Sequence, residues 1–282
     1  MRVRFVALIV ATTAWAGCDD NVPSPEQSSD LSADTTEDVA LEVSDDLADV
    51  GTDVDPLADY DYPTQGVTAM WALDSALETS FFDYPFPSDR RLNENGGPNL
   101  ETFPTNHGSR SLIRGAVRAA EAVQGYSAVS PVYFRFEGAI DPDTLPAGPA
   151  ESLLADASVF LVDIDPDSPW YGRRHPVTPI FIEDEGVYWE SNTLVLAPVY
   201  GVPMRADTTY AAVVTTAVQN TDGEPVIGPR DLVEVLAGIA DEGTQSWFEP
   251  ALRVIQSLGV ERNQIASLTV FTTGSPVREM FA

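Results

Sequence analysis

Alternating hydrophobic and polar positions mark the middle of the chain as β-structure. Between residues 131 and 137, Val132, Phe134 and Phe136 alternate with Tyr133, Arg135 and Glu137, which is the pattern of a half-buried strand. Further strands, separated by Gly, Asn and Asp turns, are predicted at 158–164, 177–182, 187–190, 193–196 and 210–218. Segment 158–164 is apolar nearly throughout, as expected of a central strand. Six or so strands in roughly a hundred residues predict a mainly β fold, an immunoglobulin-like β-sandwich over residues 131–228.

Helical periodicity precedes these strands. Residues 109–124 place one set of apolar side chains on a common face, with Gly125 suited to the position after the helix: Leu112, Ala116, Val117, Ala120 and Val123. Three arginines occupy the other face at i, i+4 spacing: Arg110, Arg114 and Arg118. In so acidic a chain we expect them to pair with carboxylates of the same molecule. The alternative is a site for an anion.

The segment after the sandwich, 229–282, predicts a helical connector with a last strand. Helices are expected at 231–240 and 247–258, and a strand at 265–272. Ser275 followed by Pro276 then resembles a helix start. So short a helix would not hold alone, and we expect the connector to be truncated here.

The first 17 residues form a predicted signal peptide. Arg2 and Arg4 precede an apolar run that is too short to span a bilayer. The segment 15–18, Trp-Ala-Gly-Cys, resembles the lipobox of bacterial lipoproteins. That resemblance implies a lipid on Cys18 and a place in the cell envelope, at the outer membrane or the periplasmic face. The alternative is an ordinary signal peptide with an incidental cysteine.

Charge changes the picture of the next segment, 18–65. From Asp19 to Tyr62 acidic residues recur and no basic residue occurs, so chain entropy outweighs burial and a disordered tether is predicted. Closely spaced carboxylates such as Asp53 and Asp55 lack the turn glycine and closing acid of a calcium loop. The formal net charge of −29 excludes nucleic acid as an expected partner.

Candidate chemistry is sparse. No Gly-x-Ser-x-Gly motif occurs, and the two histidines, His107 and His175, are predicted as surface loop residues. The segment 163–167, Asp-Ile-Asp-Pro-Asp, begins like a calcium loop. Because Ser168 replaces the glycine and Arg174 the closing acid, we expect a polar strand end, with calcium binding as the alternative. No catalytic residue, cofactor or metal is therefore predicted.

Four segments carry a family resemblance: 136–145, 194–198, 207–210 and 221–226. They resemble bacterial Ig-like domains of the surface-layer-protein type. With the lead-in Pro-Phe-Pro-Ser-Asp at 85–89, they are also similar to the N-terminal domain of bacterial virulence-factor lipases. Tyr210 stands where such sandwiches place a corner tyrosine, whose hydroxyl bonds a backbone group just upstream.

These observations predict a non-catalytic, lipid-anchored cell-envelope protein with an Ig-like spacer or interaction domain. Loops and a helix at 66–130 are expected to pack on the sandwich. The membrane and another envelope protein are the expected partners. The alternative is an accessory domain of an exported lipase or esterase whose α/β-hydrolase domain is missing from this chain, which a Gly-x-Ser-x-Gly motif encoded in frame beyond Ala282 would favour.

Overall fold

Two antiparallel sheets form the centre of the computed structural model, which describes residues 55–73, 80–104, 111–275 and 277. Three strands make the first sheet, in the order β2 (Val132–Arg135), β6 (Thr193–Pro198) and β5 (Val177–Ile182). Four make the second, in the order β4 (Arg174–His175), β3 (Val159–Asp163), β7 (Thr209–Thr215) and β9 (Ile265–Thr272). The predicted mainly β fold is confirmed. Its assignment as immunoglobulin-like stays a prediction.

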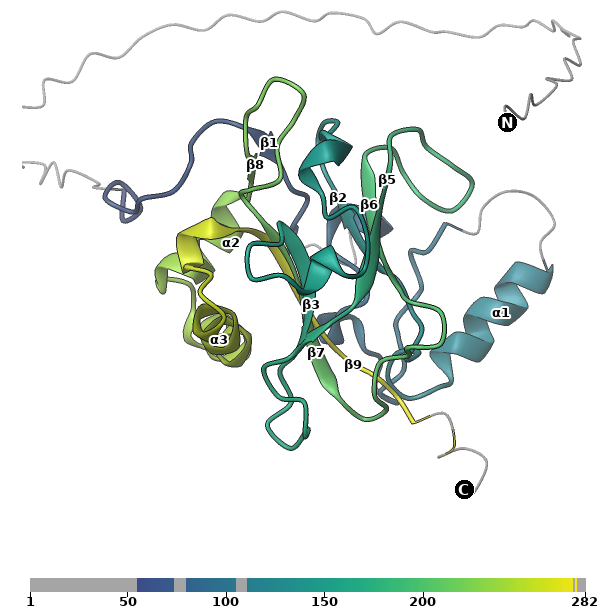
Figure 1. Ribbon diagram of the computed structural model, residues 1–282. Helices are drawn as coiled ribbons and strands as arrows, with labels where there is room; N and C mark the ends of the chain where they lie inside the picture. Colours follow the sequence, from purple (N-terminus) through teal and green to yellow (C-terminus); the bar gives the residue numbers. More distant parts are fainter. Residues whose placement is uncertain (1–54, 74–79, 105–110, 276, 278–282) are drawn as a thin grey trace, which may run out of the picture. The chain divides into compact units, whose positions relative to one another are not determined.

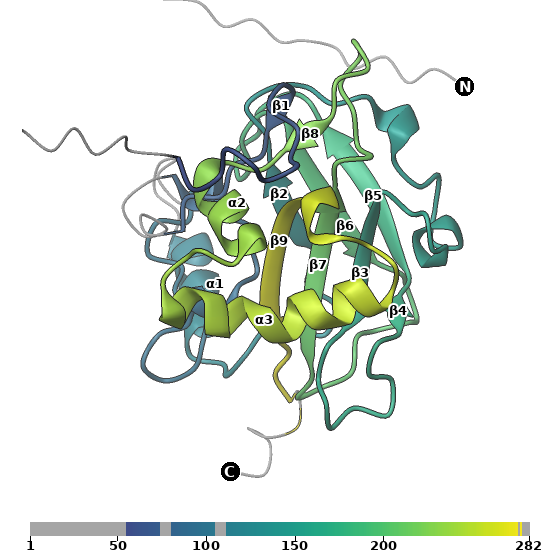
Figure 2. The ribbon, with the colours of Figure 1, turned by 90° about the vertical axis from the view of Figure 1, so that its left-hand side faces the viewer.

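The two sheets pack face to face because alternate side chains of each point inward. Phe134 of β2 and Leu194 of β6 meet Leu161 of β3, Ala212 of β7 and Phe271 in one buried cluster. The far face of the four-stranded sheet is also covered. Helices α2 (Arg230–Ala237) and α3 (Glu242–Ser257) lie across it, as Figure 2 shows. Strand β3, buried along its whole length, therefore has a hydrophobic layer on both sides.

The helix layer forms a second core. Phe248 of α3 is fully buried and its ring centroid lies 5.3 Å from that of Trp71. The indole Nε1–H of Trp71 donates a 2.7 Å hydrogen bond to the carbonyl oxygen of Leu268 in β9. Helix α3 begins five residues earlier than predicted, because the Asp241 carboxylate accepts a hydrogen bond from the Thr244 N–H and caps it. Strand β9, expected in the connector, pairs with β7 along its length.

Shorter elements complete the unit (Figure 1). Strand β1 (Val67–Thr68) pairs parallel with β8 (Val226–Ile227), and α1 (Ser111–Glu121) lies on the side of the three-stranded sheet. Single 3-10 turns are found at Phe81–Asp83, Asp89–Arg91, Pro142–Thr144, Glu151–Leu153 and Arg262–Gln264.

Residues 55–65, which the sequence assigned to the tether, contact the folded unit. The Tyr62 hydroxyl donates to the Ile265 carbonyl oxygen at 2.9 Å and accepts from the Gly228 N–H at 2.6 Å. Asp55 forms an ion pair with Arg230 at 2.9 Å. Within the described residues, the chain therefore already packs on the helix layer from Asp55 onward. The rest of the predicted tether and the signal peptide lie outside the described residues.

Candidate functional site

Helix α1 is the least covered helix of the described structure. Only Ile113, Val117 and Glu121 among its described side chains are even half-buried. Leu112 is 82% exposed and does not share the face predicted for it. The helix also ends at Glu121, so Gly125 follows it after a turn and does not cap it directly. One turn or more of apolar helix surface is thus left without a covering element among the described residues.

An apolar groove of about 950 Å³ runs along this face of α1. The helix contributes Ile113, Ala116, Val117, Ala120 and, just beyond its end, Val123. Segment 126–131, Tyr133 of β2, and Tyr188 and Trp189 also line it. Gly274 and Ser275, which follow β9 after Thr273, are also among the lining residues. Most of these groups are hydrophobic, so the groove suits an apolar occupant.

Packed aromatic rings give the groove a rigid floor. The ring centroid of Phe81 lies 4.9 Å from that of Phe82 and 5.0 Å from that of Phe86. The ring of Phe86 meets that of Tyr126 edge to face at 5.5 Å. The Tyr126 hydroxyl donates a 2.6 Å hydrogen bond to the Ser88 carbonyl oxygen, so that ring is fixed. Such a floor is preformed rather than assembled on binding.

Charged side chains gather at one rim, beside Trp189. Arg135 forms ion pairs with both Asp83 and Glu190, and the Ser80 hydroxyl bonds the Glu190 carboxylate. Burial raises the pKa of Glu190, and the neighbouring Arg135 counteracts that shift. One arginine faces two carboxylates here, and these ion pairs tie Glu190, the residue after the groove-lining Trp189, to Arg135 of β2.

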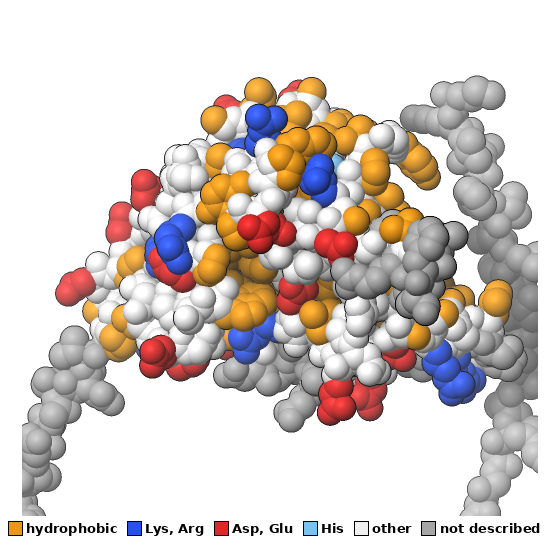
Figure 3. Space-filling view, turned by 90° about the horizontal axis from the view of Figure 1, so that it is seen from below, with side chains coloured by type: hydrophobic (Ala, Val, Ile, Leu, Met, Phe, Trp, Pro, Cys, Tyr) orange, Lys and Arg blue, Asp and Glu red, His pale blue; other side chains and the backbone are white. Residues whose placement is uncertain are grey.

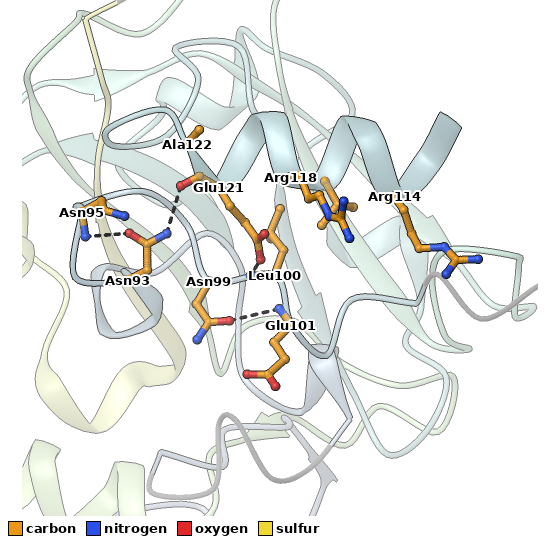
Figure 4. Close-up of a pocket in the computed structure, with 10 residues that line it drawn as sticks. Asn93, Asn95, Asn99, Leu100, Glu101, Arg114, Arg118, Glu121 and Ala122 are labelled. Atoms are coloured by element: carbon orange, nitrogen blue, oxygen red, sulfur yellow. Dashed lines mark hydrogen bonds between the residues drawn. The ribbon is translucent and has the colours of Figure 1, made fainter. Parts of the chain in front are cut away.

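On its other side, α1 is held by polar contacts in a separate pocket of about 760 Å³, shown in Figure 4. The Asn93 side-chain amide donates to the Glu121 carbonyl oxygen at 2.9 Å. The Glu121 carboxylate accepts from the Leu100 N–H at 3.2 Å. Arg114 and Arg118 extend from the helix along this pocket (Figure 4), and neither forms an ion pair with a described carboxylate. For these two arginines, the predicted pairing is therefore not observed.

Two glycines allow the backbone to close around the end of α1. A Cβ at Gly97 would lie 2.2 Å from the Glu121 carbonyl oxygen. Gly125 has φ 68°, and a Cβ there would lie 2.7 Å from the Gly274 backbone nitrogen. Both contacts exclude any side chain at these positions. These two glycines let the end of α1 pack closely against the loop at Gly97 and against Gly274, which follows β9.

The prediction that His175 is a surface loop residue is wrong. His175 lies in β4 opposite Leu161 and is only 4% exposed. Its Nε2 lies 3.1 Å from the Val202 carbonyl oxygen, to which Nε2–H donates. Burial lowers the pKa of His175, while the Val202 carbonyl and the Asp163 carboxylate act in the opposite direction. The residue is a packed, hydrogen-bonded imidazole of the core. His107, like Cys18, lies outside the described residues.

The carboxylates of the calcium-loop-like segment 163–167 accept hydrogen bonds from within the same segment and from Ser168. Asp163 accepts from the Asp165 N–H at 3.1 Å and from the Ser168 hydroxyl at 2.5 Å. Asp165 in turn accepts from the Asp167 N–H at 2.9 Å. Over the described ranges, no group of three potential metal ligands is found. These carboxylates stabilise the turn between β3 and β4.

The expected corner tyrosine is present. The Tyr210 hydroxyl accepts a 2.9 Å hydrogen bond from the backbone N–H of Arg205, five residues upstream. Its ring is buried and stacks on Phe271 with centroids 6.2 Å apart. Tyr210 therefore ties the entry of β7 to the core and has a structural role.

The predicted strand at 187–190 is not formed. The Gly186 N–H donates to the Trp189 carbonyl oxygen at 2.9 Å, and the chain bends at 187–189 instead. Tyr188 and Trp189 line the groove, and the Tyr188 ring stacks on Phe103 at 6.3 Å. The groove was missed from the sequence. Its only sequence signals are the aromatic residues at 81–86 and the apolar face of 109–124.

No helix in the described ranges is long and apolar enough to cross a membrane.

Figure 3 shows one face of the molecule, where hydrophobic side chains are exposed among scattered acidic and basic ones. Exposed apolar surface of this kind is a feature of interaction sites when it gathers in a groove.

Comparisons with known proteins add little to this geometry. No protein-family model matches the sequence, and no curated protein matches it at a significant level. Three solved structures of the bacterial surface-layer protein SbsC are similar to parts of the chain. A recombinant form and an N-terminal part each show 18% identity and a TM-score of 0.21 over 40% of this chain. A structure of domains 1–6 shows 14% identity and a TM-score of 0.21 over 45% of it.

The matched part spans only 14%, 24% and 17% of those three chains. These structures give no support for a lipase or a lipoprotein. They belong to the surface-layer class that the sequence resembles, but at a TM-score of 0.21 they establish no common fold. The architecture described here rests on the strand pairing and the buried contacts of the chain itself.

Proposed function

We propose that this protein is a non-catalytic, lipid-anchored component of the cell envelope whose folded part is an interaction module. The groove along α1 carries the proposal. It combines an uncovered apolar helix face with a preformed aromatic floor, and it contains few polar groups that could act on a substrate. The occupant that fits is an apolar segment of a polypeptide.

A polypeptide segment fits better than a compact small molecule. The groove is lined by α1 and by the loop at 126–131, in which the Ser130 N–H donates to the Ser127 carbonyl oxygen at 2.9 Å. An amphipathic segment laid beside a helix buries three or four side chains in such a channel. Trp189, 37% exposed at the rim, supplies the kind of aromatic contact that dominates protein interfaces.

A lipid on Cys18 would hold this folded module at a membrane. Cys18 follows the signal peptide within the lipobox-like segment, and the acidic stretch after it would extend by self-repulsion. Growth with a radioactive fatty acid should label the protein, and Cys18→Ala should abolish the label. Persistent labelling of the variant would contradict lipidation at Cys18, and the proposed binding in the groove would still stand.

A photo-reactive amino acid placed in the groove tests the interaction. Ala120 lines the groove, whereas the adjacent Ala119 is also exposed on α1 but does not line it. In cells making the whole protein, a cross-linker at 120 should join the groove to a discrete polypeptide segment, and the same group at 119 should not. Equal yields from both positions, or no polypeptide adduct from 120, would contradict the proposed function.

A further inference from the structure

We infer that the polypeptide segment bound by the groove is acidic, and that its carboxylates pair with Arg114 and Arg118 on the neighbouring face of α1. This inference rests on the proposed function, because it takes the groove as the binding surface for an apolar segment. It adds the chemical class of the partner, which is an amphipathic segment with Asp or Glu beside its apolar side chains. Three observations carry it.

The first observation is the position of the two arginines on α1. Arg114 directly follows Ile113, which lines the groove. Arg118 directly follows Val117, which lines the groove as well. Successive residues of a helix are about 100° apart around its axis, so both arginines stand at the margin of the groove. Their spacing of i, i+4 places both side chains on one side of the helix, as Figure 4 shows.

The second observation is that the groove adjoins the pocket along which these arginines extend. Leu100 and Val117 line both of them. Arg114 and Arg118 line the pocket, and Ile113 lines the groove. A single segment can therefore pack apolar side chains in the groove while its polar side chains reach the two guanidinium groups.

The third observation is that no carboxylate of the described residues compensates these two charges. Glu101 and Glu121 line the same pocket, but neither forms an ion pair with Arg114 or Arg118. The Glu121 carboxylate accepts the Leu100 N–H instead. Elsewhere in the described structure four arginines each form an ion pair with a carboxylate: Arg135, Arg230, Arg253 and Arg262. In a chain of formal net charge −29, two neighbouring uncompensated arginines are a local exception that favours an anionic ligand.

These charges also weaken α1 until an anion binds. Like charges at i and i+4 repel each other on a helix. Arg114 lies in the first turn, where the helix dipole disfavours a cation, and this turn contains no acidic residue. A helix of 11 residues is marginal in water even without these costs. A carboxylate bound by the two guanidinium groups replaces the repulsion with charge-assisted hydrogen bonds.

The test uses the cross-linker at 120 in cells making the whole protein, with the arginines of α1 changed. In R114E/R118E the yield of the polypeptide adduct should fall several-fold, because the carboxylates of the partner then meet like charge. R114K/R118K keeps the charge and should retain most of the adduct. The matched control is Arg173→Glu, which should leave the yield unchanged. Arg173 is exposed and forms no ion pair with a described carboxylate.

Two further readouts do not depend on charge reversal. Mass spectrometry of the adduct should find Asp or Glu within about one helical turn of the cross-linked position in the partner. In membrane vesicles, added NaCl should lower the yield in wild type by screening the ion pairs. In R114Q/R118Q, which removes the repulsion within α1, NaCl should have little effect.

The outcomes separate the two proposals. A polypeptide adduct of equal yield in wild type and R114E/R118E, or a partner segment without acidic residues, would overturn this inference and leave the proposed function standing. The inference would also be overturned by an equal fall in R114E/R118E and Arg173→Glu, because net charge alone would explain it. R114K/R118K falling as far as R114E/R118E would overturn it as well. No polypeptide adduct from 120 in any of these proteins would overturn both proposals.

Discussion

At the scale of single residues, several buried polar side chains are held by one or two tertiary contacts that the sequence does not predict. Arg91 is 1% exposed, its guanidinium donates to the Phe81 carbonyl oxygen, and it lies 4.7 Å from the Phe81 ring centroid. Tyr210 could be predicted because its role depends on a local turn. His175 and Arg91 could not, because their partners come from distant segments. Local sequence therefore predicts local hydrogen bonds and misses tertiary ones.

His175 gives a pH prediction. Burial holds its folded-state pKa below the value of about 6.5 in an unfolded chain. Below that pH the unfolded state binds more protons, so stability should fall as the pH falls through 6.5. The Asp163 carboxylate and the Tyr210 ring, which lie near His175, do not reverse the direction.

His175→Gln keeps an N–H donor but cannot titrate. Urea unfolding at pH 7.5 and pH 5 should show that wild type loses more stability on acidification than the variant does. Parallel losses in both proteins would show that His175 is not the group responsible.

At the scale of elements, the hydrophobic pattern predicted where strands form, and tertiary packing determined which surfaces they contact. Strands β5 and β9 begin and end where the alternation predicts. The uniform hydrophobicity of β3 indicated burial on both faces, but not that α2 and α3 supply the second layer. Segment 187–190 has the residues of a strand, yet its aromatic side chains turn toward the groove. Tertiary contacts override β-propensity there.

The helix layer gives a stability prediction. Phe248 is fully buried between Trp71, Trp247 and the sheet, so Phe248→Ala leaves a cavity and should cost about 3–5 kcal/mol. Arg253→Ala on the same helix removes a largely exposed side chain and should change stability by less than about 0.5 kcal/mol. Urea unfolding midpoints compare the two. Similar effects would show that α3 is not packed as described.

At the scale of the whole molecule, buried phenols link stability to alkaline pH. Burial raises the pKa of Tyr62 to about 12, and it raises the pKa values of Tyr84 and Tyr126 further. An unfolded phenol ionises near 10, so between pH 10 and 12 the unfolded state releases protons that the folded state retains. Stability should therefore fall across this range. Arg91, whose pKa burial lowers to about 10, acts in the opposite direction as a single group.

The measurement is a joint titration. A part of the phenolate absorbance should appear only together with the change in circular dichroism, because these three buried tyrosines ionise only as the protein unfolds. Ionisation of every tyrosine near pH 10 with the fold intact would contradict the burial assigned to them.

The whole molecule also shows where sequence reasoning ends. The groove is made by six segments that meet only in the folded protein: 82–86, 98–103, 113–123, 125–133, 188–189 and 274–275. Each segment alone reads as a loop, a surface helix or a strand. A surface made from six such segments has no local signature, although its aromatic and apolar members are visible in the sequence.

The central claim is that an apolar segment covers the free face of α1, and amide hydrogen exchange of residues 111–121 tests it most directly. In membrane vesicles holding the whole protein, α1 should exchange slowly, although an uncovered helix of this length is marginally stable. Ala120→Asp should accelerate its exchange on the order of tenfold by expelling the occupant. Ala119→Asp, the same change on the adjacent outward position, should not. Equal exchange in both variants and wild type would contradict the account.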